Sequence, residues 1–176
     1  GVVELCVPTG IAAIAAGFDP CLITHGLPSD ASDGFSAGNL EPMCALAARA
    51  DVIVCGPGFG RSPEINQLVK TLWQKMPQPM VFDADALFAL AQLTFDEVKQ
   101  HAGARILTPH AGEMQRLLGM DGRLQRTHEN LCRDELELAA KTLAQEIGSV
   151  IVLKGPHTLI TDGAGQWHNA TGNPGM

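Results

Sequence analysis

Residues 51–63 read DVIVCGPGFGRSP, a sequence that combines a strand, a glycine turn and the start of a helix. The apolar run that ends at Cys55 is typical of a strand buried on both faces of a sheet. Ser62 is suited to cap a helix and Pro63 to occupy its first position. Apolar residues then recur at helical spacing, at Ile65, Leu68, Val69 and Leu72. A strand that leads directly into a helix predicts an α/β fold with a parallel sheet.

The same alternation of strands and helices extends over the whole chain. Further strands are expected at 2–7, 21–24, 80–82, 105–107 and 150–153, with a hairpin at 158–161 and 166–168. Helices are expected at 11–16, at 39–50 with Asn39 as N-cap, at 84–92, 95–102 and 111–118, and from about 127–130 to 147. The charged stretch 126–141 is expected to form a solvated helix face. We therefore predict one α/β domain over residues 1–176.

Composition argues against several classes of partner. The formal net charge is −7 and the chain has no basic cluster, which disfavours nucleic acid and anionic membranes as partners. No apolar run approaches the length of a membrane span. A small anion remains an acceptable ligand, because one lysine and a few backbone N–H groups suffice to bind it.

The cysteine pattern favours reduced thiols over metal ligands. The five cysteines include no Cys-x-x-Cys pair, and no Cys/His pair has the spacing of zinc ligands. The cysteines are Cys6, Cys21, Cys44, Cys55 and Cys132, and four of the five lie in apolar strand or helix stretches. We expect buried, reduced thiols in a cytoplasmic protein.

Unusual residues follow four successive predicted strands. The turn Gly56-Pro57-Gly58 follows the first, Asp83 to Asp85 the second, Thr108 to His110 the third, and Lys154-Gly155 the fourth. In parallel α/β sheets, ligands bind at the carboxyl ends of the strands. The sequence therefore predicts a binding site at this edge.

The glycine turn allows more than one interpretation. A dinucleotide-binding fingerprint needs its third glycine at position 61, where this chain has Arg61. The alternatives are a simple turn, a different glycine loop that lines a ligand, formed by Gly56, Gly58 and Gly60, and the dinucleotide loop itself, since Asp83 ends the next strand, where such folds hold a ribose.

The carboxylates and the histidine also allow structural interpretations. Asp83 and Asp85 could orient a ligand or cap the following helix. His110 could likewise cap a helix or face a ligand above the sheet edge. Lys154 is the strongest single signal, because a lysine that directly ends an apolar strand needs either solvent exposure or a partner anion.

Five motifs together resemble one family. They read DVIVCGPGFG (51–60), VFDADAL (81–87), ILTPHAGE (106–113), VLKGPHT (152–158) and TGNPGM (171–176). Their order and spacing resemble those of the ADP/ATP-dependent NAD(P)H-hydrate dehydratases, the YjeF-type carbohydrate-kinase-like domain of the ribokinase-like superfamily. This resemblance covers essentially the whole chain. It implies a ribokinase-like three-layer α/β sandwich with a mostly parallel central sheet, incomplete at both termini.

The resemblance implies a repair reaction and a set of site residues. NADH hydrate or NADPH hydrate would be dehydrated at the expense of ADP or ATP, with Mg²⁺ on the nucleotide phosphates. Gly56, Gly58, Gly60 and His110 would line the hydrate cleft. The nucleotide would contact Lys154, Gly155, Pro156, His157 and Thr158. Further candidates, without an assigned role, are Asp83, Asp85, Asn173 and Gly175. No residue of the chain is expected to bind a metal directly.

The resemblance places the catalytic base in a Gly-x-Gly-Asp sequence beyond Met176, so no catalytic residue is expected within the chain. We expect the chain alone to be inactive. Smaller departures are Ala111 for proline and Phe59 for leucine. A homo-oligomer and an NAD(P)H-hydrate epimerase, fused or separate, are compatible with the resemblance. The alternatives are a ribokinase-like kinase for a small alcohol and a degenerate, non-catalytic nucleotide-binding module.

Overall fold

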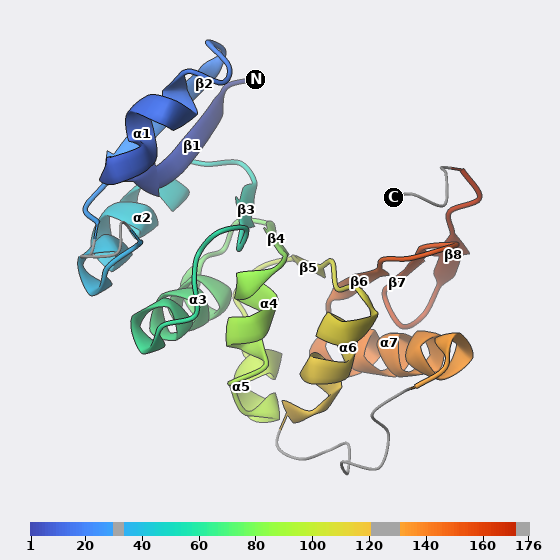
Figure 1. Ribbon diagram of the computed structural model, residues 1–176. Coiled ribbons are helices and arrows are strands. Elements are labelled where there is room, and N and C mark those ends of the chain that lie inside the picture. The colour runs from blue at the N-terminus through green and yellow to red at the C-terminus, as the bar shows by residue number, and fades with distance from the viewer. Residues whose placement is uncertain (30–33, 121–130, 172–176) are drawn as a thin grey trace.

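The computed structural model describes residues 1–29, 34–120 and 131–171. Its main feature is a six-stranded sheet in the order β3-β4-β5-β6-β7-β8 (Figure 1). The four strands from β3 to β6 are parallel, and β7 and β8 form the antiparallel hairpin that the sequence predicts. The strands are β3 (Ile53–Cys55), β4 (Met80–Phe82), β5 (Arg105–Leu107), β6 (Val150–Leu153), β7 (Leu159–Thr161) and β8 (Gln166–His168). The predicted α/β fold with a mostly parallel sheet is confirmed.

Helices cover one face of this sheet (Figure 1). They are α3 (Pro63–Lys75), α4 (Asp85–Leu90), α5 (Phe95–Lys99), α6 (Ala111–Leu118) and α7 (Arg133–Ile147). The core lies between these helices and the sheet, and it buries Trp73, Phe82, Leu107 and Ile151 completely. Ser62 caps α3 as predicted, because its Oγ accepts a hydrogen bond from Ile65 N at 3.3 Å.

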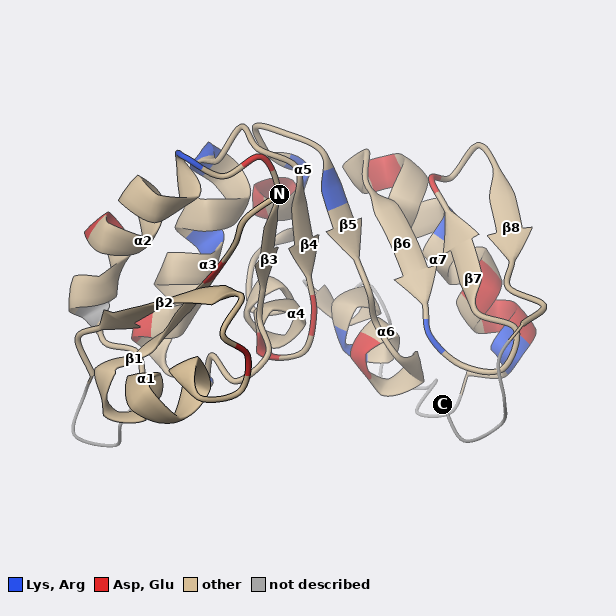
Figure 2. Ribbon diagram, turned by 90° about the horizontal axis from the view of Figure 1, so that it is seen from above, with Lys and Arg blue, Asp and Glu red and all other residues tan. Residues whose placement is uncertain are grey.

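The opposite face of the sheet is apolar but more exposed. Figure 2 looks onto this face, and among the residues that the structure describes no helix lies over it from β4 to β8. Val54 is 68% exposed and Trp167 is 57% exposed. The described residues thus supply the sheet and one helical layer of the predicted three-layer sandwich.

The N-terminal part forms a separate parallel pair of strands. β1 (Val3–Pro8) pairs with β2 (Leu22–Leu27), and α1 (Thr9–Ala16) connects them. A short helix, η1 (Ala37–Asn39), leads into α2 (Leu40–Ala47). Asn39 precedes α2 as predicted, but its side chain does not cap that helix. It is fully buried and instead binds Ser36 N and Pro28 O, which ties the loop to the helix.

Several sequence predictions differ from the structure at this level. α2, α4 and α5 end earlier than predicted, and β2 extends to Leu27. The start predicted for the last long helix, at 127–130, lies outside the described residues; the described helix α7 begins at Arg133. The cysteine prediction was wrong in part, because Cys55 is buried whereas Cys21 and Cys132 are exposed. Of the described helices, none combines the length and the apolar character needed to cross a membrane.

Candidate functional site

The carboxyl ends of the parallel strands meet at one edge, as predicted. Backbone hydrogen bonds join the segments that follow neighbouring strands: Asp83 N donates to Cys55 O at 3.1 Å, and Thr108 N donates to Phe82 O at 3.1 Å. Lys154 N donates to Pro109 O at 2.8 Å. Figure 2 shows acidic residues at the end of β4 and a basic residue at the end of β6 on this edge. The fold therefore brings the four strand-end motifs side by side.

Lys154 has the partner anion that its position requires. Its Nζ lies 2.6 Å from Asp83 Oδ1 and 3.8 Å from Glu113 Oε2. The lysine side chain remains 39% exposed, whereas the Glu113 side chain is nearly buried. An ammonium held between two carboxylates, yet open to solvent, can exchange one of them for a phosphate group.

The electrostatics of Asp83 follow from these contacts. Partial burial by itself raises the pKa of Asp83, but the hydrogen bond from Lys154 outweighs it, together with bonds from Ala84 N and the Thr108 hydroxyl. The net result is a pKa below the usual value of an aspartate. Ala84, the next residue, has a φ of 51°, which is strained for a residue with a side chain. Such strain is often found at functional sites.

In the glycine turn after β3, one glycine is packed against the neighbouring backbone and two have free space beside them. Gly56 has a φ of +128°, and a Cβ on it would lie 1.8 Å from Asp83 O. Only glycine permits the strand ends to approach this closely. Gly58 and Gly60 also have positive φ, but nothing lies within 4 Å of the place where a Cβ would stand. The open side of the turn is therefore at Gly58 and Gly60.

Asp85 holds this turn in place. Its Oδ2 accepts a hydrogen bond from Gly60 N at 3.1 Å, and its Oδ1 accepts one from Arg61 Nε at 2.9 Å. The N-cap of α4 is Ala84, and α4 has no side-chain cap bond. Capping of α4 by Asp83 or Asp85, the structural alternative, is therefore wrong, and each carboxylate binds a different part of the edge.

His110 caps α6, the structural role considered for it. Its Nδ1 accepts hydrogen bonds from Gly112 N at 3.0 Å and Glu113 N at 3.4 Å, and Glu113 Oε2 accepts one from His110 N at 2.8 Å. A neutral imidazole that accepts at Nδ1 carries its proton at Nε2. Nε2 lies 3.4 Å from Glu113 Oε1, and since the side chain is 59% exposed, a ligand above the edge can reach this nitrogen but has to compete with that carboxylate for its proton.

In the loop after β6, the hydroxyl of Thr158 binds the backbone of Gly155. Thr158 Oγ1 accepts a hydrogen bond from Gly155 N at 3.3 Å and donates to Gly155 O at 2.9 Å. Because Gly155 N already has this partner, an anion would have to compete with the hydroxyl for it. His157 has a φ of 54°, and Pro156 has no N–H. Asn173 and Gly175 lie outside the described residues.

Two residues of this edge were missed as site candidates. Glu113 was assigned only to the first turn of a helix, and its distance to Lys154 depends on how two strands align. Arg133 was assigned to a solvated helix face, which is wrong, because its guanidinium donates to the carbonyl oxygens of Leu153, Lys154 and His157. A cation in the first turn of a helix opposes the helix dipole, but the predicted helix start at 127–130 did not mark Arg133 as the first helical residue.

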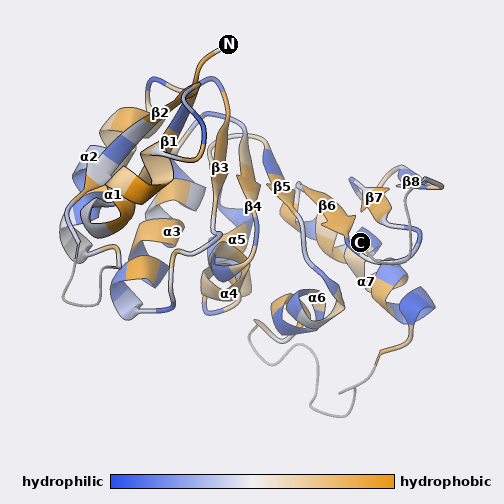
Figure 3. Cartoon of the chain, turned by 45° about the horizontal axis from the view of Figure 1, so that its top comes forward, coloured by the Kyte–Doolittle hydropathy of each residue, from blue (hydrophilic) through white to orange (hydrophobic). Residues whose placement is uncertain are grey.

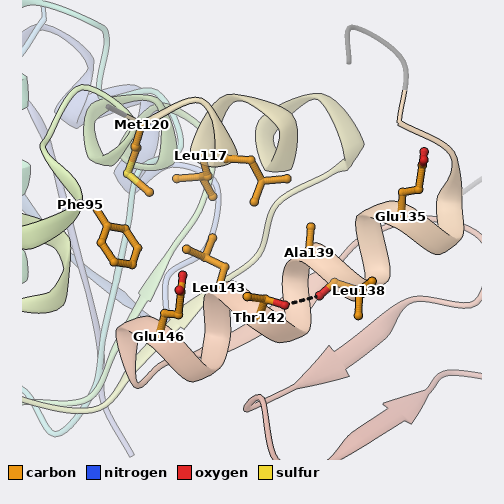
Figure 4. Close-up of a pocket in the computed structure, with 10 residues that line it drawn as sticks. Phe95, Leu117, Met120, Glu135, Leu138, Ala139, Thr142, Leu143 and Glu146 are labelled. Atoms are coloured by element: carbon orange, nitrogen blue, oxygen red, sulfur yellow. Dashed lines mark hydrogen bonds between the residues drawn. The ribbon is translucent and has the colours of Figure 1, made fainter. Parts of the chain in front are cut away.

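A cavity of about 360 Å³ lies elsewhere, between α6, α7 and the start of α5 (Figure 4). Leu117, Met120 and Leu143 contribute to its mostly apolar lining, and its charged groups are the carboxylates Glu135 and Glu146. The described part of this lining includes no cation, so the cavity is unsuitable for phosphate groups, whereas the sheet edge presents the ammonium of Lys154. The geometry therefore favours the sheet edge as the site for an anionic ligand. Among the described residues, no group of three or more His, Cys, Asp or Glu could hold a metal ion.

Comparison with protein families gives a match over the whole chain. A carbohydrate-kinase family model described as NAD(P)H-hydrate dehydratase matches residues 1–176. The bifunctional NAD(P)H-hydrate repair enzyme Nnr of Moorella thermoacetica is 41% identical over 177 residues, which is 100% of this chain and 32% of that protein. Its counterpart in Thermofilum pendens is 34% identical over 158 residues, covering 89% of this chain and 29% of that protein. The chain thus spans about a third of the length of these curated relatives.

Solved structures show the same architecture. The ADP/ATP-dependent NAD(P)H-hydrate dehydratase of Bacillus subtilis, co-crystallised with ATP/Mg²⁺ and soaked with CoA, aligns with a TM-score of 0.67 at 27% identity. This alignment covers 98% of the present chain and 56% of that chain. A ribokinase-like superfamily protein of Enterococcus faecalis aligns with a TM-score of 0.70 at 22% identity, covering 99% and 55%. At that identity the second likeness shows the fold alone.

Proposed function

The chain belongs to the NAD(P)H-hydrate dehydratase family, and from this premise we propose that the complete protein dehydrates NADH hydrate and NADPH hydrate at the expense of ADP or ATP. One observation of the structure supports this most directly. The ammonium of Lys154 lies at the carboxyl edge of the sheet, between the carboxylates of Asp83 and Glu113. A cation at this edge, beside an open glycine turn, suits a phosphate donor and a neighbouring acceptor.

The proposed chemistry explains why a kinase-like fold performs an elimination. The hydroxyl of the hydrate is a poor leaving group. Transfer of the terminal phosphoryl group of ATP or ADP to that oxygen gives a phosphate ester and leaves ADP or AMP. The C–O bond then breaks with its electrons on the departing phosphate. Loss of a proton from the adjacent ring carbon restores the double bond of the nicotinamide ring.

In this proposal the nucleotide binds at the loop after β6. Lys154 would exchange its bond to Asp83 for one to a nucleotide phosphate, while Thr158 and the backbone of Gly155, Pro156 and His157 would shape the loop. Mg²⁺ fits as an ion carried by the nucleotide phosphates, because such ions bind only one or two protein carboxylates. Asp83 and Glu113, the two carboxylates beside Lys154, would be near it. The ion would supply charge neutralisation for the transferred group.

The hydrate would bind on the open side of the glycine turn. Gly58 and Gly60 leave space at the turn, and the exposed His110 would donate from Nε2 to the hydrate in place of Glu113 Oε1, which lies 3.4 Å away. The role of Gly56 in this proposal is indirect, because it holds the turn against Asp83. We assign no catalytic base, since the Gly-x-Gly-Asp sequence that the resemblance implies does not occur in the 176 residues.

The relatives are bifunctional repair enzymes, so we include a partner activity in the proposal. An NAD(P)H-hydrate epimerase, fused to this domain or separate from it, would convert the other epimer of the hydrate into the substrate. Both activities would act in the cytoplasm, where the reduced dinucleotides are used.

The test uses the complete gene product that contains this chain. We expect it to restore NADH from NADH hydrate, followed by dihydronicotinamide absorbance, when ADP or ATP and Mg²⁺ are present and not without nucleotide. Recovery of NADH that does not depend on nucleotide, or no recovery of NADH at all, would contradict the proposal. Phosphorylation of a small alcohol without any hydrate repair would favour the kinase alternative.

The lysine is tested by substitution. Lys154→Ala is expected to weaken ADP and ATP binding about tenfold or more, because a charge-assisted hydrogen bond to phosphate is lost. The matched control is Lys75→Ala, an exposed lysine in the last turn of α3. Isothermal titration with each nucleotide measures the effect. An unchanged affinity of the Lys154 variant would remove this residue from the site.

A further inference from the structure

Arg133, the first residue of α7, spans the two ends of the loop after β6. Its Nη2 donates to His157 O at 3.1 Å and to Leu153 O at 3.4 Å. Its Nη1 donates to Lys154 O at 3.4 Å. A planar guanidinium can make such divergent bonds at once, which a lysine ammonium on a flexible stem cannot reproduce. One side chain therefore fixes the carbonyl groups before and after the glycine of the loop.

The loop that Arg133 holds is conformationally costly. Gly155 has a φ of +146°, and a Cβ at this position would lie 2.9 Å from Arg133 Nη1. The guanidinium thus packs directly on the bare Cα of Gly155. His157 has a φ of 54°, which is unfavourable for a residue with a side chain. The bond from Arg133 to His157 O stabilises this strained turn from outside.

Other residues in turn fix Arg133. Glu137, one turn later in α7, accepts a hydrogen bond from Arg133 Nε at 2.7 Å. The same carboxylate lies 2.9 Å from Nε2 of His168 on β8. These contacts lower the pKa of Glu137, with the His168 bond as the largest cause, so it stays ionised at neutral pH. The pairing offsets the unfavourable placement of a cation at the N-terminus of a helix.

We propose that Arg133 is a positioning residue for nucleotide binding, and that it acts by setting the conformation of the Lys154–Thr158 loop. Its guanidinium is turned to loop carbonyls and to Glu137, so it does not need to touch the nucleotide. Without it, the backbone that orients the Lys154 ammonium and the Thr158 hydroxyl relaxes. This inference rests on the proposed function, in which that loop receives ADP or ATP.

The test compares variants of the complete gene product. Arg133→Gln removes the charge and most of the hydrogen bonds. Arg133→Lys keeps the charge but loses the planar guanidinium with its several N–H donors. Lys141→Gln, a cation further along α7, is the matched control for net charge. The dissociation constants for ADP and ATP, the KM values for nucleotide and for hydrate, and the melting temperature are measured for each protein.

We expect Arg133→Gln to raise the nucleotide Kd and KM about tenfold, with the KM for hydrate nearly unchanged. Arg133→Lys should fall between this variant and the wild type, and Lys141→Gln should match the wild type. Unchanged nucleotide binding in Arg133→Gln would overturn the proposal, whatever the melting temperature. An equal loss of affinity for nucleotide and hydrate would also overturn it, because a general loss of structure would then be the cause.

Comparing the wild type with the variants shows which of the two proposals fails. If the wild-type protein binds neither ADP nor ATP, the proposed function fails and this inference fails with it. If the wild type binds but Arg133→Gln binds equally well, only the inference fails. Should Arg133→Gln not fold, Glu137→Gln replaces it, since it releases Arg133 while keeping the guanidinium. A smaller rise in nucleotide Kd is expected there, and no change would contradict the proposal.

Discussion

At the scale of single residues, the charged group around Lys154 is the most informative feature. Asp83 and Lys154 are 71 positions apart in the chain, and Glu113 comes from the first turn of α6, the helix that follows β5. Two carboxylates around one ammonium leave an excess of negative charge. Such a group favours a further cation, and it keeps the lysine in place until a phosphate replaces a carboxylate.

The ion pair gives a testable pH dependence. Because the folded-state pKa of Asp83 is lowered, its contribution to stability is fully present above the unfolded value of about 3.9 and is lost as the pH falls through the folded pKa. Asp83→Asn removes this contribution. Urea unfolding at neutral and acidic pH should therefore show a stability difference between the wild type and Asp83→Asn that shrinks on acidification.

A matched control sharpens this measurement. Asp51 is exposed at the approach to β3, so Asp51→Asn should change the free energy of unfolding little at either pH. A difference between wild type and Asp83→Asn that stays constant from neutral to acid pH would contradict the ion pair as a source of stability.

At the scale of elements, the turn from β3 to α3 determines how the strand ends approach each other. Gly56 allows the turn to contact Asp83, and Asp85 returns to bind Gly60 and Arg61. Arg105, the first residue of β5, makes a second contact between segments that are distant in the sequence. It is only 1% exposed, and its guanidinium binds carbonyl oxygens of Trp73, Met76 and Gln78 at the end of α3.

The two glycines of the turn should respond differently to substitution. Gly56→Ala places a Cβ 1.8 Å from a backbone oxygen, so we expect a loss of about 3 kcal/mol or more in unfolding free energy. Gly58→Ala has the cost of a positive φ alone, about 1–2 kcal/mol, because the space is open. Denaturant unfolding of the two variants measures the difference. Equal losses would show that the close approach at Gly56 does not constrain the turn.

At the scale of the whole molecule, apolar surface remains on one side of the sheet. Figure 3 shows hydrophobic residues along α1 and β6 as well as in the helices that form the core. On the more exposed face Val54 of β3 is 68% exposed, and Val52, just before this strand, is 58% exposed. Exposed apolar area of this kind promotes association in water.

We expect the 176-residue chain, prepared by itself, to self-associate through this face. Replacing Val52 and Val54 together by Thr keeps β-propensity and should reduce association, with little change in stability because both side chains are exposed. Leu138→Thr is the control, since Leu138 is also 68% exposed but lies on α7. Sedimentation velocity over a range of concentrations measures this. A monomer at every concentration would contradict the expectation.

Local signals in the sequence predicted the elements and the edge where the site candidates lie. Strand and helix periods gave the parallel sheet, and the rule that ligands bind at carboxyl ends of strands gave the edge. Helix ends were less accurate, as α5 shows, because contacts beyond the helix decide where a last turn unravels. Asn39 was predicted to cap a helix, yet its buried amide satisfies a distant loop carbonyl instead.

The sequence by itself determined the order of strands and helices, the family, and the residue types at the four strand ends. Only the tertiary structure decided that Asp83 pairs with Lys154, that Gly56 is needed for close approach, and that Arg133 holds the loop after β6. The physical reason is that periodicity and capping act between near neighbours in the chain. Ion pairs, steric contacts and carbonyl contacts join residues whose proximity depends on how the sheet is assembled.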